Sequence, residues 1–263
     1  MMPGGASGTR AAKGMMMTRV SIIVPVYNEK TTADILLKQV LAFNMPGVEK
    51  EIVIVEGNST DGTRQVVEKY SGNPEVKILY EDGPCGRGAA ICKGFEIATG
   101  EVVFFQDADL EYSVADYPAI LGPVLSGEAD VVIGSRTNAR GQQTWQFREF
   151  SGMERFYGFV MNLGGLLYTG LFNVLYGTSF LDGCAMFKVF RKKVLKEISI
   201  VSKGFDFDWE LQGKLVRKGY RFAEVPVSYK ARGRGEGKKI CFWRDGWKVF
   251  LAIVRFRFAK IKL

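Results

Sequence analysis

Two aspartates one residue apart follow a run of four hydrophobic residues, at positions 102–105, near the middle of the chain. In an extended chain, side chains two residues apart point to the same side, so Asp107 and Asp109 can converge on one cation, and Glu111 continues that face. Mg²⁺ is usually held by one or two carboxylates together with substrate phosphates. The motif therefore predicts a metal site for a diphosphate ligand. Acids at this spacing also occur in solvated loops, so the rest of the chain has to decide between the two.

The charge distribution points to an anionic partner. Histidine is absent from the 263 residues, which excludes imidazole as a base or a metal ligand. Residues 228–263 contain 11 Lys and Arg against 2 Asp and Glu, whereas the rest of the chain contains 25 and 26. All the excess positive charge therefore lies at one end, as expected for contact with phosphate, anionic lipid or nucleic acid.

The cysteines and the first residues bear on the compartment. The 4 cysteines have neither metal-ligand spacing nor the density of a disulfide scaffold, which indicates a reducing cytosol. Residues 1–18 are rich in Gly, Ala and Met and lack the continuous apolar core of a signal peptide. We expect them to form a disordered extension.

Short apolar runs alternate with longer amphipathic segments between residues 20 and 136. The short runs predict strands at 20–26, 51–55, 76–80, 102–106 and 130–134. The longer segments predict helices at 32–43, 61–70, 88–98 and 115–125. This alternation predicts an α/β fold with a mostly parallel sheet flanked by helices.

Polar side chains follow three of the predicted strands. Tyr27 and Glu29 come after the first strand, Glu56 and Asp61 after the second, and the acids at 107–111 after the fourth. Ligands of open parallel sheets bind beyond the carboxyl ends of the strands, so these loops should meet at one site.

Arg87 stands between two glycines at the start of a predicted helix. Glycines allow close backbone approach, and a helix N-terminus with a cation attracts phosphate. The alternative is an ordinary turn that caps the helix.

Residues 156–181 contain no charged side chain. Their length would allow a membrane span, but glycines, asparagines and threonines interrupt the apolar sequence. This pattern favours a pair of short helices that lie in a membrane interface or form a hydrophobic lid, while a span or core helices remain alternatives.

The C-terminal segment combines an apolar stripe with basic residues. Spacings of three and four predict one helical stripe made of Trp243, Trp247, Phe250, Val254, Phe258 and Ile261. Basic residues occupy the other sides, as in a helix that lies on anionic lipid. A helix that packs on the core is the alternative.

Several motifs occur in a fixed order along the chain: Pro-Val-Tyr-Asn-Glu at 25–29, Ser-Thr-Asp-Gly-Thr at 59–63, Gly-Arg-Gly-Ala-Ala at 86–90, Asp-Ala-Asp at 107–109, Gly-Ser-Arg at 134–136, Asp182 and Lys188, Phe-Asp-Trp-Glu at 207–210, Glu-Val-Pro at 224–226 and Gly-Lys-Lys-Ile at 237–240. With these motifs, from residue 20 to about 256, the chain resembles the inverting GT-A glycosyltransferases of family two. It is most similar to the polyprenyl-phosphate glycosyltransferases, which include dolichol-phosphate mannose synthases and undecaprenyl-phosphate glucosyltransferases.

The resemblance implies a Rossmann-like GT-A catalytic domain over residues 19–230, with membrane-interfacial amphipathic helices at about 155–181. A basic amphipathic segment, 231–263, would follow it. The implied cofactor is Mg²⁺ or Mn²⁺, held by Asp107, Asp109 and Glu111. The implied nucleotide-binding residues are Pro25, Tyr27, Glu29, Glu56, Asp61, Arg87 and Asp107.

The implied reaction is the inverting, metal-dependent transfer of a hexose, from UDP-glucose, GDP-mannose or a similar donor, to a polyprenyl phosphate. A phosphomonoester has its second pKa near ~6, so at neutral pH this acceptor is already a nucleophile and needs cations rather than a base. The acceptor phosphate would meet Arg136, Arg148, Arg155, Lys238 and Lys239. The catalytic residues would be Asp109, Arg136, Asp208 and Glu210.

Two alternatives stay open. If the acceptor is a hydroxyl of a soluble compound or a polysaccharide, Asp208 or Glu210 is the candidate base; otherwise these acids cap a helix or are solvated. A catalytically silent protein that binds nucleotide sugar or membrane is also compatible with the chain. The second loop reads Glu56-Gly57 where the family usually has Asp-Asp, which leaves the nucleobase open.

The expected partners are the donor, the lipid acceptor and an anionic membrane surface. Nucleic acid is not expected, because it leaves the acidic motif unexplained. A homo-oligomer is compatible with the sequence but not indicated by it. Family members often carry transmembrane helices after the catalytic domain, whereas this chain ends at Leu263. We therefore expect a cytoplasmic protein, peripheral on the cytoplasmic face of a membrane.

Overall fold

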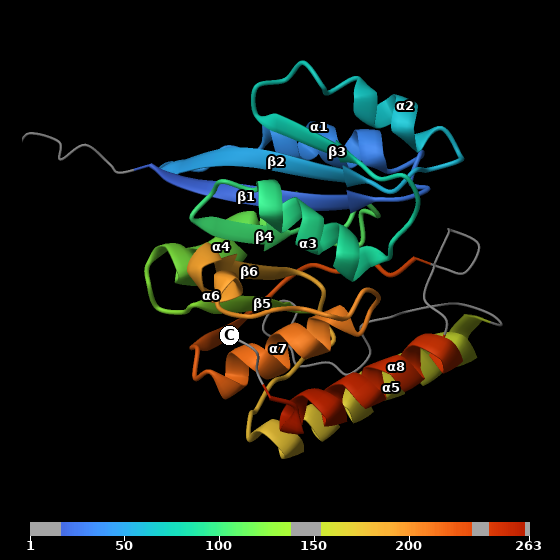
Figure 1. Ribbon diagram of the computed structural model, residues 1–263, viewed down its shortest axis with the longest axis vertical. Coiled ribbons are helices and arrows are strands. Elements are labelled where there is room, and N and C mark those ends of the chain that lie inside the picture. Colours follow the sequence, from blue (N-terminus) through green and yellow to red (C-terminus); the bar gives the residue numbers. More distant parts are fainter. Residues whose placement is uncertain (1–16, 138–153, 233–241, 261–263) are drawn as a thin grey trace, which may run out of the picture.

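A mixed sheet forms the centre of the molecule (Figure 1). The computed structural model describes residues 17–137, 154–232 and 242–260. In the described chain the strands are β1 Thr18–Val26, β2 Val48–Glu56, β3 Val76–Tyr80, β4 Val102–Phe105, β5 Val131–Ser135, β6 Lys188–Arg191 and β7 Phe222–Pro226. Their order across the sheet is β3-β2-β1-β4-β6-β5-β7. Of the described strands, β6 alone runs antiparallel to its neighbours, β4 and β5.

Helices cover both faces of this sheet. They are α1 Ala33–Ala42, α2 Thr63–Glu68, α3 Arg87–Ile97, α4 Tyr117–Leu125, α5 Glu154–Tyr176, α6 Lys192–Lys196, α7 Phe207–Arg217 and α8 Phe242–Phe258, with a short 3₁₀ turn, η1, at Val114–Asp116. α1, α2 and α4 pack on one face, and α3, α6 and α7 on the other. Ile22 and Ile23 of β1 enter opposite cores, as the alternation of a strand requires.

The predicted α/β fold with a mostly parallel sheet is confirmed. Each of the five predicted strands and four predicted helices has an observed counterpart, with ends that differ by a few residues. β6 and β7 were not predicted. β1 begins at Thr18, inside the predicted extension, whose residues 1–16 lie outside the described chain.

α5 and α8 lie side by side along the edge of the molecule near α7 (Figure 1). Residues of α5, α7 and α8 share a third core, which contains Phe172, Trp209 and Ile253. The predicted pair of short helices at 156–181 is wrong, because α5 is one helix from Glu154 to Tyr176. Its glycines do not break it, since packing against two neighbouring helices outweighs the roughly 1 kcal/mol that each glycine costs.

α8 turns its predicted apolar stripe outward. Trp247 and Phe258 are 62% and 72% exposed, whereas Ile253 and Phe256 of the opposite side are buried in the third core. The helix therefore has apolar residues on both sides, and only one side is used in packing. The side chain of Trp243 and residue Ile261 lie outside the described residues.

Candidate active site

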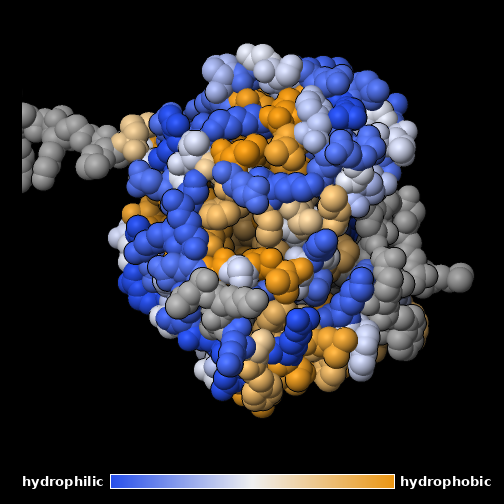
Figure 2. All heavy atoms as spheres, viewed as in Figure 1, coloured by the Kyte–Doolittle hydropathy of each residue, from blue (hydrophilic) through white to orange (hydrophobic). Residues whose placement is uncertain are grey.

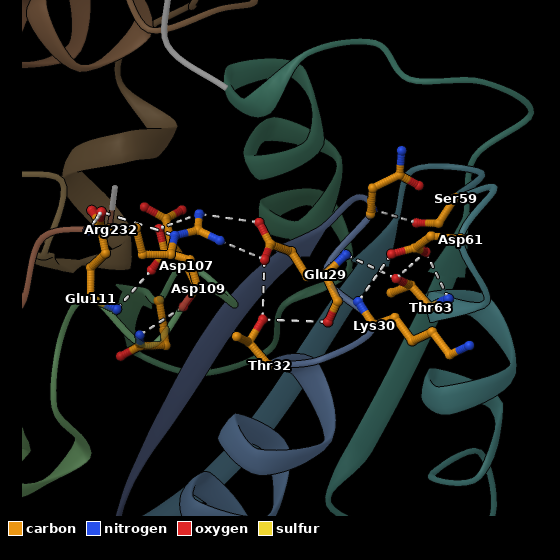
Figure 3. A network of polar contacts seen from close by, with 12 residues as sticks. Glu29, Lys30, Thr32, Ser59, Asp61, Thr63, Asp107, Asp109, Glu111 and Arg232 are labelled. Atoms are coloured by element: carbon orange, nitrogen blue, oxygen red, sulfur yellow. Dashed lines mark hydrogen bonds and ion pairs between the residues drawn. The ribbon is translucent and has the colours of Figure 1, made fainter. Parts of the chain in front are cut away.

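The loops that follow β1, β2 and β4 meet at one edge of the sheet, as predicted (Figure 3). A cleft of about 500 Å³ opens there, lined by residues of the first two loops, by Asp109 and Leu110, and by residues 230–232 after β7. Among the described residues, the three non-glycine residues with positive φ are Asn28, Asn58 and Leu110, and all three lie in these loops. Such conformations are uncommon outside glycine and tend to gather at functional sites.

The acidic motif forms a turn rather than an extended strand. Leu110 has φ 60°, and the backbone N–H of Glu111 donates to Asp109 Oδ1 at 3.0 Å. The chain therefore bends between the second and third acids, and Glu111 does not continue the face of the first two. The expectation of one extended face was wrong, because it took no account of a left-handed residue inside the motif.

Glu111 holds a segment that follows β7, residues 228–232, which we call the strap. Its carbonyl accepts from Lys230 N at 2.9 Å, and its carboxylate accepts from Tyr229 Oη and Arg232 N, both at 2.8 Å. In this arrangement the side chain of Glu111 anchors a neighbouring segment.

Arg232 is a site residue that the sequence did not single out. Its guanidinium donates to Glu29 at 2.8 Å and to Asp109 Oδ2 at 3.1 Å, and so lies between loops that are far apart in the sequence (Figure 3). It is one of 11 basic residues in the C-terminal stretch, and no spacing distinguished it from the others.

Asp109 has the most perturbed carboxyl group of the site. Burial, followed by the charges of Asp107 and Glu111, raises its pKa to about 7, although Arg232 opposes the shift. The described residues contain no group of three Asp, Glu, His or Cys side chains placed to share a metal ion. The pair Asp107 and Asp109 nevertheless fits Mg²⁺ or Mn²⁺, because these ions need only one or two carboxylates when substrate phosphates supply other ligands.

Asp107 belongs to a buried chain of charges. Arg87 Nε donates to Asp107 Oδ1 and Arg87 Nη1 to Asp208 Oδ2, both at 2.8 Å. Lys188, fully buried, donates to Asp208 Oδ1 at 3.0 Å. Burial opposes the charged form of Arg87, but Asp107 and Asp208 outweigh it and raise its pKa. Arg87 Nη2 is buried and has no hydrogen-bond partner among the described residues.

The glycines beside Arg87 serve the packing of α3. Gly86 has φ 95°, and a Cβ there would lie 2.5 Å from Lys203 O. A Cβ on Gly88 would lie 2.6 Å from Phe207 Cβ. These close contacts bring the start of α3 against the start of α7, which places Arg87 next to Asp208.

Glu210 is fully buried, and its hydrogen-bond partners differ from those of Asp208. Its carboxylate accepts from the backbone N–H groups of Val201 and Ser202, at 3.1 and 2.7 Å, and from Lys214. It therefore fixes the loop before α7. The role of Glu210 in catalysis stays a prediction.

Arg136 is only 3% exposed and forms a two-pronged ion pair with Asp182, at 2.8 and 2.7 Å. The backbone N–H groups of Leu181 and Asp182 donate to Glu224 at 2.8 and 2.9 Å. Glu224 thus orients Asp182, which orients Arg136 over the ring of Tyr229, 5.1 Å from its centroid. The sequence motifs at 134–136, 182 and 224–226 are joined here into one network.

The predicted nucleotide-binding loops are held by their own side chains. Glu56 is fully buried and accepts from Asn58 N and Ser59 N at 3.2 and 2.7 Å. Asp61 accepts from Thr63 N at 2.9 Å and from Lys30 N at 3.1 Å. Pro25 and Tyr27, at the end of β1, are half-buried.

The predicted acceptor cations are mostly outside the described chain. Arg148, Lys238 and Lys239 fall in residues 138–153 and 233–241, so their placement stays a prediction. Arg155 lies exposed at the start of α5.

The outer side of α5 and α8 exposes large apolar side chains. On α5 these are Phe156 at 75%, Leu167 at 64% and Val174 at 83%; on α8 they include Trp247 at 62% and Leu251 at 47%. Figure 2 shows hydrophobic and hydrophilic residues mixed along the edge where Figure 1 has these helices. By length and composition, Arg155–Tyr176 is the one described helical stretch able to cross a membrane, and a third of its apolar window, 33%, is buried in the protein.

Residues 21–199 match the family described as glycosyl transferase family 2. The chain belongs to this family. A dolichol-phosphate mannosyltransferase of Pyrococcus furiosus is 28% identical over 222 residues, which are 84% of this chain and 59% of that protein. An undecaprenyl-phosphate mannosyltransferase of Micrococcus luteus is 28% identical over 228 residues, or 84% and 87%. The glycosyltransferase AglD of Haloferax volcanii is 24% identical, and the chain spans 33% of its length.

The fold of this family 2 member matches solved structures. Glucosyl-3-phosphoglycerate synthase from Mycobacterium tuberculosis, in complex with Mn²⁺, UDP and phosphoglyceric acid, superposes with a TM-score of 0.69 at 16% identity. The match covers 92% of this chain and 80% of that one. The same synthase with Mg²⁺ and UDP gives a TM-score of 0.65. The GT-A type of fold is therefore confirmed.

Proposed function

We propose that this protein transfers a hexose from a nucleotide sugar to a polyprenyl phosphate at a membrane surface, with Mg²⁺ or Mn²⁺ as cofactor. The names of the Pyrococcus and Micrococcus relatives support a polyprenyl-phosphate acceptor and a mannosyl donor. The Mn²⁺ or Mg²⁺ and the UDP bound in the glucosyl-3-phosphoglycerate synthase structures support a metal-bound nucleotide sugar. The labelling test below identifies the sugar and the nucleobase of the donor.

The observation that carries this proposal is the hydrogen bonding of Asp208 and Glu210, the two candidate general bases. Both oxygens of Asp208 accept hydrogen bonds from buried cations, Arg87 and Lys188. Both oxygens of Glu210 are taken by backbone N–H groups and Lys214. The oxygens of both carboxylates are therefore occupied by partners within the protein, so neither carboxylate is placed as a free acceptor for a substrate hydroxyl. A polyprenyl phosphate does not need a base, whereas a hydroxyl acceptor does.

On the donor side, Asp107 and Asp109 would hold the metal ion against the diphosphate. The metal supplies charge stabilisation for the leaving phosphate. Arg87 adds a guanidinium nitrogen that has no partner among the described residues and lies beside Asp107. The acids therefore serve to bind the donor and to orient Arg87, and the inverting transfer proceeds by one displacement on the sugar.

On the acceptor side, the exposed apolar side of α5 and α8 would rest on the lipid surface. Arg155, Lys248 and Arg255 are exposed on the same two helices, so the surface combines apolar and basic groups. This combination suits an anionic membrane interface. We propose that the protein contacts the cytoplasmic face of the membrane.

The test is transfer of label from radioactive GDP-mannose, UDP-glucose and UDP-GlcNAc, in parallel, to polyprenyl phosphate with Mn²⁺ present. We expect label from one donor in the organic-extractable lipid. Label that reaches only water-soluble hydroxyl acceptors would replace this proposal with the alternative reaction. Donor binding without transfer to any acceptor would identify a silent relative.

Membrane contact has its own test. Replacing both Trp247 and Leu251 with Ser should weaken sedimentation with anionic vesicles at least about tenfold, since each exposed side chain contributes roughly 1.5–3 kcal/mol when it leaves water. The matched control is Ile35→Ser, which removes an apolar side chain that is 47% exposed on α1. Equal sedimentation of the double variant and the control would contradict the proposed contact of α8 with the membrane.

A further inference from the structure

We propose that the guanidinium of Arg232 pairs with Asp109 in the ligand-free enzyme, in place of the metal ion. Arg232 and the divalent ion then compete for Asp109. The inference rests on the metal-assisted transfer proposed above and assigns a role to a residue outside the metal motif. In this proposal the contact between the strap and Asp109 depends on whether metal and nucleotide are both bound.

The contacts of Arg232 are those of a bridging cation. One guanidinium reaches Glu29 through two nitrogens, at 2.8 and 3.3 Å, and Asp109 Oδ2 at 3.1 Å (Figure 3). Its side chain is 16% exposed, and those of Glu29 and Asp109 are 9% and 15% exposed. Charges this poorly hydrated need a partner, because burying an unpaired carboxylate is strongly unfavourable.

The strap holds Arg232 in this position. Tyr229, Lys230 and Arg232 all bind Glu111, through a side chain and two backbone N–H groups. Ser228 N donates to Asp116 at 2.8 Å, which fixes the preceding residue. The guanidinium is therefore positioned by backbone contacts, and its location is not the chance rotamer of a long side chain.

Asp109 cannot serve both cations fully. Its Oδ1 accepts the N–H of Glu111, and its Oδ2 accepts Arg232. A divalent ion bound to Asp109 would also repel a guanidinium beside it. A metal ion alone would therefore compete with Arg232 for Asp109, whereas a nucleotide diphosphate brings negative charge that can receive the guanidinium. This predicts weak binding of metal alone and stronger binding of metal with nucleotide.

The experiment measures Mn²⁺ affinity without nucleotide, from the electron paramagnetic resonance signal of free Mn²⁺. Arg232→Gln should bind Mn²⁺ about tenfold more tightly than the wild type, the size of a typical coupling between two sites. Arg232→Lys, which keeps the charge, should lie between the two. If Arg232→Gln does not fold, a tighter affinity in Arg232→Lys still supports the proposal, and an unchanged one overturns it.

The matched control is Lys230→Gln. Lys230 lines the same cleft two residues away and is exposed, and it forms no ion pair with the described acids. Its removal should change Mn²⁺ affinity less than twofold. An equal gain in Lys230→Gln and Arg232→Gln would show a general effect of charge and overturn the contact-based competition.

A second measurement repeats the titration with UDP and with GDP. Nucleotide should tighten Mn²⁺ binding more in the wild type than in Arg232→Gln, because the variant has no guanidinium to displace. Unchanged affinity in Arg232→Gln while the wild type binds Mn²⁺ overturns this inference alone. Absence of Mn²⁺ binding in every protein, with and without nucleotide, overturns the metal-dependent function as well.

Discussion

Glu51 and Asp109 are carboxylates at opposite ends of the same sheet, and their surroundings have opposite effects. Burial favours the neutral form of Glu51, but hydrogen bonds from Lys77, Ser21 and Thr99 outweigh it and lower its pKa to about 2. At the other end, burial and two neighbouring acids raise the pKa of Asp109 to about 7. Glu51 is hydrogen-bonded to Lys77, Ser21 and Thr99, whereas Asp109 shares the guanidinium of Arg232 with Glu29.

The difference separates a structural cluster from a functional one. Glu51 ties β2 to Ser21 of β1, to Lys77 of β3 and to the turn before β4, so its charge stabilises the fold. Asp109 lies close to two other acids, Asp107 and Glu111, whose charges raise its pKa, and groups perturbed in this way tend to gather at functional sites. A motif of acids alone does not distinguish the two situations; their partners do.

The largest expected effect is at the functional end. Asp109→Ala should reduce sugar transfer by at least about 1,000-fold, because in the proposed function it removes a ligand of the metal ion that stabilises the leaving group. The melting temperature should change by less than about 2 °C, since the residue lies outside the hydrophobic cores. Transfer kinetics and thermal unfolding measure the two effects, and near-normal transfer would contradict the assignment of Asp109 as a metal ligand.

Asp208→Asn should lower transfer about 100-fold through misplacement of Arg87. It should also lower the free energy of unfolding by about 3 kcal/mol, because Arg87 and Lys188 lose a shared counter-ion in a buried site. The pH profile of the remaining activity is the deciding measurement. A profile that keeps its shape fits a positioning residue, whereas loss of its acidic limb would make Asp208 the base.

Glu51→Gln tests the structural end. We expect a loss of about 2 kcal/mol in the free energy of unfolding at pH 7, with kcat unchanged. The folded pKa of Glu51, about 2, lies below its ordinary value of 4.5. The stabilisation is therefore present above pH 4.5 and is lost as the pH falls toward 2. Denaturant unfolding from pH 7 to 2.5 should show the wild type and the variant converging, and a constant difference would contradict this.

Ser21→Ala is the mildest change. Ser21 donates to Glu51 and accepts from Gly100 N at 2.8 Å, and it is fully buried. Its removal should cost about 1–2 kcal/mol in the free energy of unfolding, because two hydrogen bonds that contribute roughly 0.5–1 kcal/mol each are lost, and should leave transfer unchanged. Urea unfolding measures the first and kinetics the second. A loss of activity would mean that the two ends of the sheet are coupled.

The two clusters also show how far the sequence could be read. The acids at 107–111 were found because they follow a hydrophobic run, and the metal was expected there from their type and spacing. The structural role of Glu51 could not be predicted, since a lone acid inside a strand has no distinguishing sequence pattern. β6 was missed because it returns antiparallel after a long insertion, where no strand–helix alternation predicts a strand.

The sequence by itself determined the α/β fold, the edge of the sheet that holds the site, and the family. Local periodicity and short motifs are enough for these, since neighbouring residues carry them. Only the tertiary structure decided which charges meet. Arg87 and Asp208 are 121 residues apart, and Arg232 and Glu29 are 203 apart, so their ion pairs arise from the packing of distant segments. The physical reason is that burial makes each charge depend on its partner, and partners are chosen by the fold.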